Sequence, residues 1–392
     1  MDFELSEEEQ AFEKEVVAFL EANSSPEVMD DNPEHLSQTV ETPAKRAFMR
    51  KLAEQGWLGM SWPKEYGGQE RSGIYDFLLT EALSRFGAPQ PGKGVGIVGK
   101  TLIRHGNDEL KRYFLPRIIR GEIEFAIGYS EPQAGSDAAA MQLKAVHDEE
   151  RGGWVLNGHK IWTTSAHFAD WYWVGARTSE HKHKGITLFL IPMDHEGFEI
   201  HPTYTIGDER TNEVFFNDVF VVDSHVVGEV GEGWTYICEA LDLERFAMLP
   251  VGPVEMKLEG LLRYVKQATF DGQPLAKDPV VRQRLAKLAA DLEVARKLQR
   301  KVISEALKGR VPTVEAAMYK LWQSQLGQRI ANAALDLIGP DAALKPGQEE
   351  APVNGRYERS YRYTVVDTIG GGTSEVQKNI IARRGLGLPK NF

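Results

Sequence analysis

The sequence contains a single cysteine and no long apolar run. Cys238 cannot form a disulfide within the chain, which favours a reducing, cytoplasmic setting. No apolar stretch approaches the roughly 20 residues that a membrane-spanning helix requires. The first residues, Met1–Glu4, are acidic and lack the basic-then-apolar order of a signal peptide. We therefore expect a cytoplasmic protein without a membrane span.

An excess of basic residues is also absent. The chain has 46 Lys and Arg residues against 57 Asp and Glu residues, a net charge of -11. This balance argues against a general nucleic-acid binder, although it is compatible with a local basic patch. At 392 residues, 42% hydrophobic and 26% charged, the chain suits an ordinary globular protein with two or three domains, or with one large subdivided core.

Helical periodicity dominates the first third of the chain. Ser6 and Glu9 form the pattern of a capping box, which predicts the start of an amphipathic helix. Further helical patterns cover Ala44–Gln55, Ile74–Phe86 and Glu109–Arg120. We assign residues 1–121 to an N-terminal helical domain.

Residues 122–228 have the short, alternating apolar runs of a β-domain. Asn157-Gly158 lies between two strand-like runs within Trp154–Trp162 and predicts a hairpin turn. The other expected strands are Phe125–Tyr129, Trp171–Val174, Ile186–Ile191 and Glu213–Phe216.

The helical pattern returns in residues 229–392. Pro250 and Pro253 predict a kink after the first of these helices, and residues 340–362 predict a polar loop. The expected helices are Trp234–Leu249, Val254–Ala268, Pro279–Leu307, Thr313–Ile338 and a last one from Thr373 to Arg384. The order predicts an α+β fold: an N-terminal helical domain, a middle antiparallel β-domain and a C-terminal helical bundle.

Glu244 lies within the apolar face of the first C-terminal helix. Ile237, Ala240 and Val251 share that face at helical spacing. A carboxylate in this place should be desolvated, which raises its pKa. Two hypotheses follow for Glu244: a catalytic base, or a buried glutamate paired with an arginine. The helix alone does not decide between them.

Four short segments, three of which contain glycine, are candidates for ligand binding. Gly94–Gly99 matches the dinucleotide fingerprint, but its flanks are helical, so close packing of helices is the better interpretation. Glu131–Asp137 follows a strand and gathers small residues that can approach a phosphate or a planar ring. Trp162–Ser165 places an indole beside hydroxyls, which suits a flavin-like ring. Gly370–Gly372 permits close approach of the backbone to a ligand at the start of a helix.

Taken together, these segments resemble the flavin-dependent acyl-CoA dehydrogenases over nearly the whole chain. The matching stretches are Tyr129–Pro132 with Ala134–Asp137, Asn157–Thr164 and Gly372–Gln377. The resemblance implies FAD bound between the β-domain and the C-terminal helices, an acyl-CoA substrate and oxidation of its Cα–Cβ bond to the trans-2-enoyl thioester. It also implies a tetramer, a role in fatty acid or lipid catabolism by β-oxidation, and an electron-transfer flavoprotein as acceptor.

The resemblance also assigns roles to individual residues. It places Tyr129, Ser130, Gly135 and Ser136 at the flavin ring and the pyrophosphate, Trp162 and Thr164 at the other side of the ring, and Thr373 and Glu375 near the adenine. Many members carry the catalytic glutamate where this chain has Gly371. A minority, such as isovaleryl- and long-chain-acyl-CoA dehydrogenases, carry it in a Leu-Asp-Leu-Glu-Arg segment, found here at residues 241–245. Glu244 is therefore the expected base for the α-proton, while flavin N5 accepts the β-hydride. Asp242 and Arg245 are expected at the substrate, and the Gly371 N–H at the thioester oxygen.

Other positions depart from the family pattern. Near Thr269-Phe270, an arginine that reaches the FAD of a neighbouring subunit is replaced by Lys266 or Gln267, and a glutamine at the interface is replaced by Asp336. Two assemblies remain open: a homotetramer, or a subunit of a heterotetramer that shares FAD or its active site with another chain. Nitroalkane-oxidising relatives have an aspartate at the place of Gly371, which disfavours that reaction.

The acyl group cannot be read from these residues. Gly92, Gly94, Gly96 and Gly99 either leave room for a bulky, even ring-bearing, acyl group or serve only to pack helices.

Overall fold

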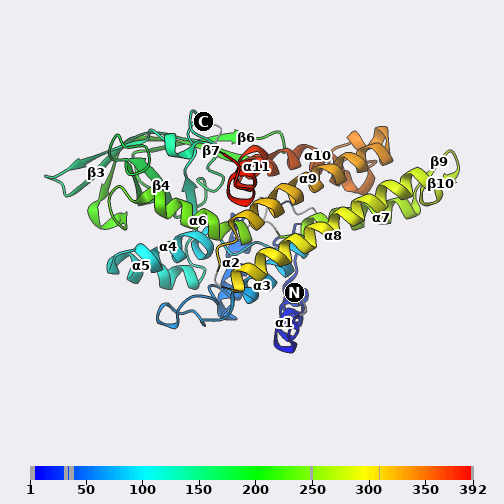
Figure 1. Cartoon of the computed structure of the whole chain (residues 1–392), viewed down its shortest axis with the longest axis horizontal. Helices are drawn as coiled ribbons and strands as arrows, with labels where there is room; N and C mark the ends of the chain where they lie inside the picture. The colour runs from blue at the N-terminus through cyan, green and yellow to red at the C-terminus, as the bar shows by residue number, and fades with distance from the viewer. Residues whose placement is uncertain (1–4, 31–33, 35–38, 248–249, 309, 390–392) are drawn as a thin grey trace.

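In chain order the sheet comes between two groups of helices, which confirms the predicted α+β fold class. The computed structural model describes residues 5–30, 34, 39–247, 250–308 and 310–389, and the side chains of residues 241–247 lie outside this description. Figure 1 shows the sheet at one end of an elongated molecule. The long helices α7 (Gly252–Gln267), α8 (Pro279–Leu307) and α9 (Thr313–Ile338) extend away from it.

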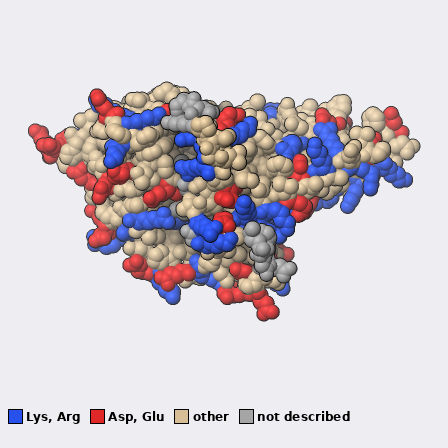
Figure 2. Space-filling view, in the orientation of Figure 1, with Lys and Arg blue, Asp and Glu red and all other residues tan. Residues whose placement is uncertain are grey.

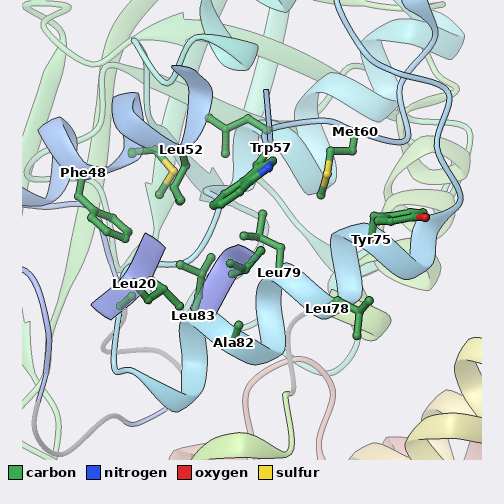
Figure 3. Close-up of a cluster of buried hydrophobic side chains, with 14 of the residues drawn as sticks. Leu20, Phe48, Leu52, Trp57, Met60, Tyr75, Leu78, Leu79, Ala82 and Leu83 are labelled. Carbon is green, nitrogen blue, oxygen red and sulfur yellow. The ribbon is translucent and has the colours of Figure 1, made fainter. Parts of the chain in front are cut away.

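The N-terminal helices pack into two apolar clusters: the first three helices pack around Trp57, and the last two belong to a cluster that they share with the sheet. The helices are α1 (Glu7–Asn23), α2 (Pro43–Glu54), α3 (Gly73–Arg85), α4 (Gly99–His105) and α5 (Asp108–Ile119). The predicted capping box is confirmed, because the Ser6 hydroxyl accepts from the Glu9 N–H and the Glu9 carboxylate accepts from the Ser6 N–H at 2.7 Å. Figure 3 shows side chains of α1, α2 and α3 converging around Trp57. This burial, more than helix propensity, holds the domain together.

The fingerprint-like segment Gly94–Gly99 is helical, as its flanks predicted. A π-helical turn, η2 (Gly94–Val98), continues directly into α4. A Cβ atom added at Gly99 would lie 2.2 Å from the Trp62 ring, and one at Gly94 would lie 3.2 Å from Ile118 and Phe125. These glycines therefore allow close packing. Gly96 differs, because no atom of the described residues lies within 4 Å of its ideal Cβ position.

One eight-stranded sheet forms the middle of the chain. Its strands are β1 (Phe125–Gly128), β2 (Lys144–Asp148), β3 (Gly153–Lys160), β4 (Trp171–Arg177), β5 (Ile186–Pro192), β6 (Phe198–Tyr204), β7 (Arg210–Val222) and β8 (Val226–Val227). The order is β6-β7-β3-β2-β4-β5-β8, with β1 joined in parallel to β4. Most other pairings are antiparallel, as predicted. Strands β2 and β6 were not predicted, because they contain few apolar residues and therefore lack a clear apolar alternation.

The hairpin predicted at Asn157-Gly158 is wrong. Both residues lie within strand β3, whose register with β7 shifts between Leu156 and Gly158. Asn157 forms no turn. Its side chain bonds to β7, where it donates to the Asp218 carboxylate at 2.8 Å and accepts from the Asp218 N–H at 2.9 Å. The register shift at Asn157-Gly158 marks a β-bulge. An Asn-Gly dipeptide is compatible with a bulge as well as with a turn.

The C-terminal part contains α6 (Gly233–Ala247), then α7, α8 and α9, followed by α10 (Arg356–Asp367) and α11 (Ser374–Ile380), with a short hairpin of β9 (Thr269–Phe270) and β10 (Gln273–Pro274). Helix α6 ends at Ala247 and α7 begins at Gly252, so the helical segment is interrupted where the prolines predicted a kink. The polar loop predicted for residues 340–362 is wrong from Arg356 onward, because α10 begins there. Its buried face is made of Tyr357, Ser360 and Tyr363, which do not stand out as an apolar stripe.

The surface carries both signs of charge. On the face in Figure 2, Lys and Arg side chains are interspersed with Asp and Glu side chains over the length of the molecule. Within the described part of the chain, no helix combines the length and the apolar character needed to cross a bilayer.

A buried polar network joins the N-terminal domain to the C-terminal helices. The Glu34 carboxylate pairs with the Lys257 ammonium of α7 and accepts from the Ser360 hydroxyl of α10 at 2.7 Å. Asp367 is buried at the end of α10. Burial raises the pKa of Asp367 to about 8, although Lys257 and Lys320 act in the opposite direction. The raised pKa favours the protonated form of the Asp367 carboxyl group at neutral pH.

Asp367→Asn should make stability less dependent on pH. In the wild type, folded Asp367 keeps its proton where the unfolded chain has lost it, so its stabilising contribution is complete below about pH 4 and is lost as the pH rises towards about 8. The thermal midpoint of the variant should therefore exceed that of the wild type by a margin that grows across this range. Asp271→Asn, at an exposed site, is the control. A margin that is constant with pH would contradict the protonated state.

Candidate functional site

Two of the segments singled out in the sequence meet at one end of the sheet. The Ser130 carbonyl, just after β1, accepts from the Ile161 N–H, just after β3, at 3.0 Å. The Tyr129 hydroxyl accepts from the Trp173 indole N–H of β4 at 2.8 Å. These bonds place Tyr129-Ser130 beside Ile161-Trp162, although 30 residues of chain separate them.

A buried ion pair holds these two segments together. The Lys160 ammonium donates to Glu131 Oε1 at 2.7 Å, and both side chains are almost fully buried. The other partners of the Glu131 carboxylate include the N–H groups of Gln142 and Leu143. Burial lowers the pKa of Lys160 to about 8, while the charge of Glu131 opposes this change. The pair thus ties the end of β3 to the loop that follows β1.

Trp162 projects from this junction in an unusual conformation. Its φ is 62°, and 56% of its surface is exposed. A left-handed backbone is costly for a bulky residue, and an exposed indole loses hydrophobic stabilisation. Asn212 of β7 supports the adjoining turn, because its amide donates to the Thr163 carbonyl at 2.8 Å and to the Thr164 carbonyl at 3.5 Å. Such a held, exposed aromatic ring suits stacking on a planar ligand.

The loop after Glu131 is open to solvent. Gly135 and Ser136 are exposed, and no described atom lies within 4 Å of the ideal Cβ position of Gly135. Asp137 is tied to Lys182 by an exposed ion pair of 2.8 Å. The small side chains leave the backbone accessible to a ligand group.

The glycine loop between α10 and α11 is also open at its centre. Gly371 has a φ of 67°, is exposed, and has no described atom within 4 Å of its ideal Cβ position. Thr373 caps α11 by accepting from the Val376 N–H at 3.2 Å, and Glu375 is exposed in the first turn. Gln377 is fully buried and donates to the Gly371 and Gly372 carbonyls at 3.2 and 3.1 Å.

The backbone of Glu244 lies in α6, while the side chains of Asp242, Glu244 and Arg245 lie outside the described residues. Other predicted members of the apolar face, Ile237 and Ala240, are buried. Helix α6 packs against η2 and α4.

Comparison with known proteins accounts for this arrangement. Three family models match in succession: the acyl-CoA dehydrogenase N-terminal domain at residues 6–122, the middle domain at residues 126–219 and the C-terminal domain at residues 231–386. The chain belongs to the acyl-CoA dehydrogenase family. It is therefore a flavoprotein oxidoreductase that acts on CH–CH bonds, with FAD as its cofactor.

Relatives of this acyl-CoA dehydrogenase cover most of its length. Acyl-CoA dehydrogenase FadE26 from Mycobacterium tuberculosis is 35% identical, with 88% of each chain covered. The mitochondrial isovaleryl-CoA dehydrogenase of Solanum tuberosum is 30% identical and covers 95% of this chain and 89% of its own. Among solved structures, the ChsE4-ChsE5 complex from M. tuberculosis has a TM-score of 0.90 at 31% identity, and the Tcur3481-Tcur3483 steroid ACAD has a TM-score of 0.89 at 32% identity. Both cover 100% of each chain.

The open segments fit FAD. An exposed, strained indole, a loop with accessible backbone at Gly135 and an open glycine loop are features expected of a site that closes on a flat, phosphate-bearing ligand. The buried Oε1 of Gln377 has no hydrogen-bond partner among the described residues, so this acceptor remains for a ligand or water.

Three supporting residues were missed in the sequence. Lys320 of α9, Gln377 of α11 and Asn212 of β7 each hold a candidate ligand-binding segment through its carbonyl groups. Each is a polar residue at a buried position, and a buried polar residue cannot be told from an exposed one by spacing alone. Lys160 and Glu131 lie within segments that the sequence predicts to bind a ligand, but the sequence does not predict their ion pair.

Lys160→Met should destabilise the enzyme and reduce its flavin content. Removal of one member of a buried pair leaves the Glu131 charge without its partner, which costs about 3–5 kcal/mol. Lys160→Met/Glu131→Gln should recover much of the loss, because the amide oxygen still accepts from the Leu143 N–H without carrying a charge. Thermal midpoints and the ratio of flavin to protein absorbance measure both effects. A double variant no more stable than Lys160→Met would show that the pair is not the source of the loss.

Proposed function

We propose that this enzyme converts an acyl-CoA thioester to the trans-2-enoyl-CoA, with Glu244 as the base that removes the α-proton. The observation that carries the proposal is the open, side-chain-free position at Gly371. A loop with glycine there offers N–H groups but no carboxylate. The Leu-Asp-Leu-Glu-Arg segment of α6 supplies the carboxylate that the reaction needs.

The proposed roles divide between the helix and the loop. Thioester α-protons are weakly acidic, so the carbonyl oxygen needs donors as it becomes enolate-like. The Gly371 N–H serves this purpose, and Asp242 and Arg245 lie near Glu244 along α6 to orient the substrate. FAD supplies the acceptor for the β-hydride at N5. Tyr129, Ser130, Gly135, Ser136, Trp162, Thr164, Thr373 and Glu375 are the residues proposed to hold FAD.

A bulky acyl group, such as one bearing a ring system, is the substrate class that we propose. Gly96 supports it, because no described atom lies within 4 Å of its ideal Cβ position and η2 packs on α6, the helix of the proposed base. The structurally similar Tcur3481-Tcur3483 protein is described as a steroid ACAD. Reoxidation by an electron-transfer flavoprotein is proposed from the family alone.

Glu244→Gln should lower turnover by about 100-fold to 10,000-fold, the usual contribution of a general base. A panel of straight-chain, branched and ring-bearing acyl-CoA thioesters with a dye acceptor measures the rates. Glu239→Gln is the matched control: it lies on the same helix, is partly exposed and bonds to His105 at 2.8 Å. Turnover by Glu244→Gln at the wild-type rate would sink the assignment.

A second candidate function is that of a subunit in a heteromeric acyl-CoA dehydrogenase. Both of the solved structures described above carry two protein names. The departures from the family pattern at the subunit interface support it too. Lys266 or Gln267 stands in place of an arginine. Asp336, in place of a glutamine, pairs with Arg284 of this chain at 2.6 Å.

Purification of this chain alone distinguishes the two assemblies. A heteromeric subunit should retain substoichiometric flavin and gain it, together with activity, when a partner chain is co-expressed. Flavin content by absorbance and mass by light scattering measure this outcome. A homotetramer with one flavin per chain would refute the heteromeric candidate and leave the proposed reaction standing.

A further inference from the structure

The glycine loop is held by a buried lysine from a neighbouring helix. Helix α9 packs against both α10 and α11 (Figure 1). From α9, the Lys320 ammonium donates to the Asp367 carbonyl and to the Gly372 carbonyl, each at 2.8 Å. Lys320 is only 2% exposed. These two carbonyls stand at the beginning and the end of the loop, so a single side chain fixes both ends.

Gln377 completes the support from the other helix. Its amide N–H donates to the Gly371 and Gly372 carbonyls, so Gly372 receives donors from α9 and from α11. The φ of Gly372 is 93°, and its ideal Cβ position lies 2.7 Å from the Gln377 amide nitrogen. No larger residue fits there without displacing that amide.

The N–H groups of Gly371 and Gly372 differ from the others in the loop, since those of residues 368–370 donate to carbonyls of α10. Among the described residues, no group accepts a hydrogen bond from the N–H of Gly371 or Gly372. The Asp367, Gly371 and Gly372 carbonyls are thus bound on either side of the peptide group that carries the Gly371 N–H, and no described atom lies within 4 Å of the ideal Cβ position of Gly371. Lys320 is also a positive charge close to these peptide groups, which favours an anion at the donor side.

We propose that Lys320 is a positioning residue that holds the Gly371 N–H in the orientation needed to receive the thioester oxygen, with Gln377 as its second support. This inference rests on the proposed function, in which that N–H binds the developing oxyanion. A loop of three glycines has more backbone freedom than any other sequence. Fixing its carbonyls is therefore the means of orienting its donors.

Two measurements on the FAD-loaded protein test the proposal. In Lys320→Met, amide hydrogen exchange in the peptide that covers residues 368–377 should become faster. With the best substrate of the panel, kcat should fall by about 100-fold while KM changes little, since a misplaced donor affects the transition state more than the ground state. Lys320→Arg should recover part of kcat because it restores a donor.

Lys257→Met is the control for the loss of any buried lysine. It should lower the thermal midpoint without faster exchange in residues 368–377. If Lys320→Met fails to fold, Gln377→Met should reproduce the faster exchange and the lower kcat. Exchange and kcat no more affected by changes at Lys320 and Gln377 than by Lys257→Met would overturn the inference. Failure of the proposed function would be seen separately, as Glu244→Gln activity equal to that of the wild type.

Discussion

The ion pair between Lys160 and Glu131 is the interaction that holds together the segments proposed to bind FAD. It joins the end of β3 to the loop after β1, and those two places carry Trp162 and Tyr129. A buried pair contributes little net stability, because desolvation of both charges offsets most of their attraction. Its value here is geometric. An ammonium with a carboxylate on one side and the Tyr129 carbonyl at 3.4 Å on the other allows few alternative arrangements.

A buried lysine also joins distant segments at two other places in the structure. Lys257 pairs with Glu34 between the N-terminal domain and the C-terminal helices, and Lys320 binds carbonyls of the glycine loop. Each ammonium is buried and reaches a segment distant in the sequence. Apolar packing could supply comparable stability, but it tolerates small shifts of one surface on another. Directed bonds from a buried cation do not, so these residues position segments that join domains or that are proposed to bind ligands.

The sequence predicts the architecture much better than the details of the site. Periodicity located α8 and α9 to the residue, because long amphipathic helices repeat their signal many times. It failed for α10, whose buried face is built from Tyr and Ser, and for Asn157-Gly158, where the same dipeptide suits a bulge or a turn. The candidate ligand-binding segments could be predicted because each is a short local motif in the sequence. Their supports could not, because contacts of Lys320 with residues 47 and 52 positions away leave no local pattern.

The glycine at position 371 links the choice of base to the need for support. A glutamate there would bring its own side-chain packing and a narrower range of backbone angles. Glycine removes both, and its φ of 67° is one that a larger residue adopts only with strain. In the proposed mechanism, transfer of the base to α6 therefore leaves a loop that must still present an N–H accurately but can no longer restrain itself. Lys320 and Gln377 supply this restraint from neighbouring helices. The loop needs it because, in that mechanism, the carboxylate is carried by Glu244 and not by residue 371.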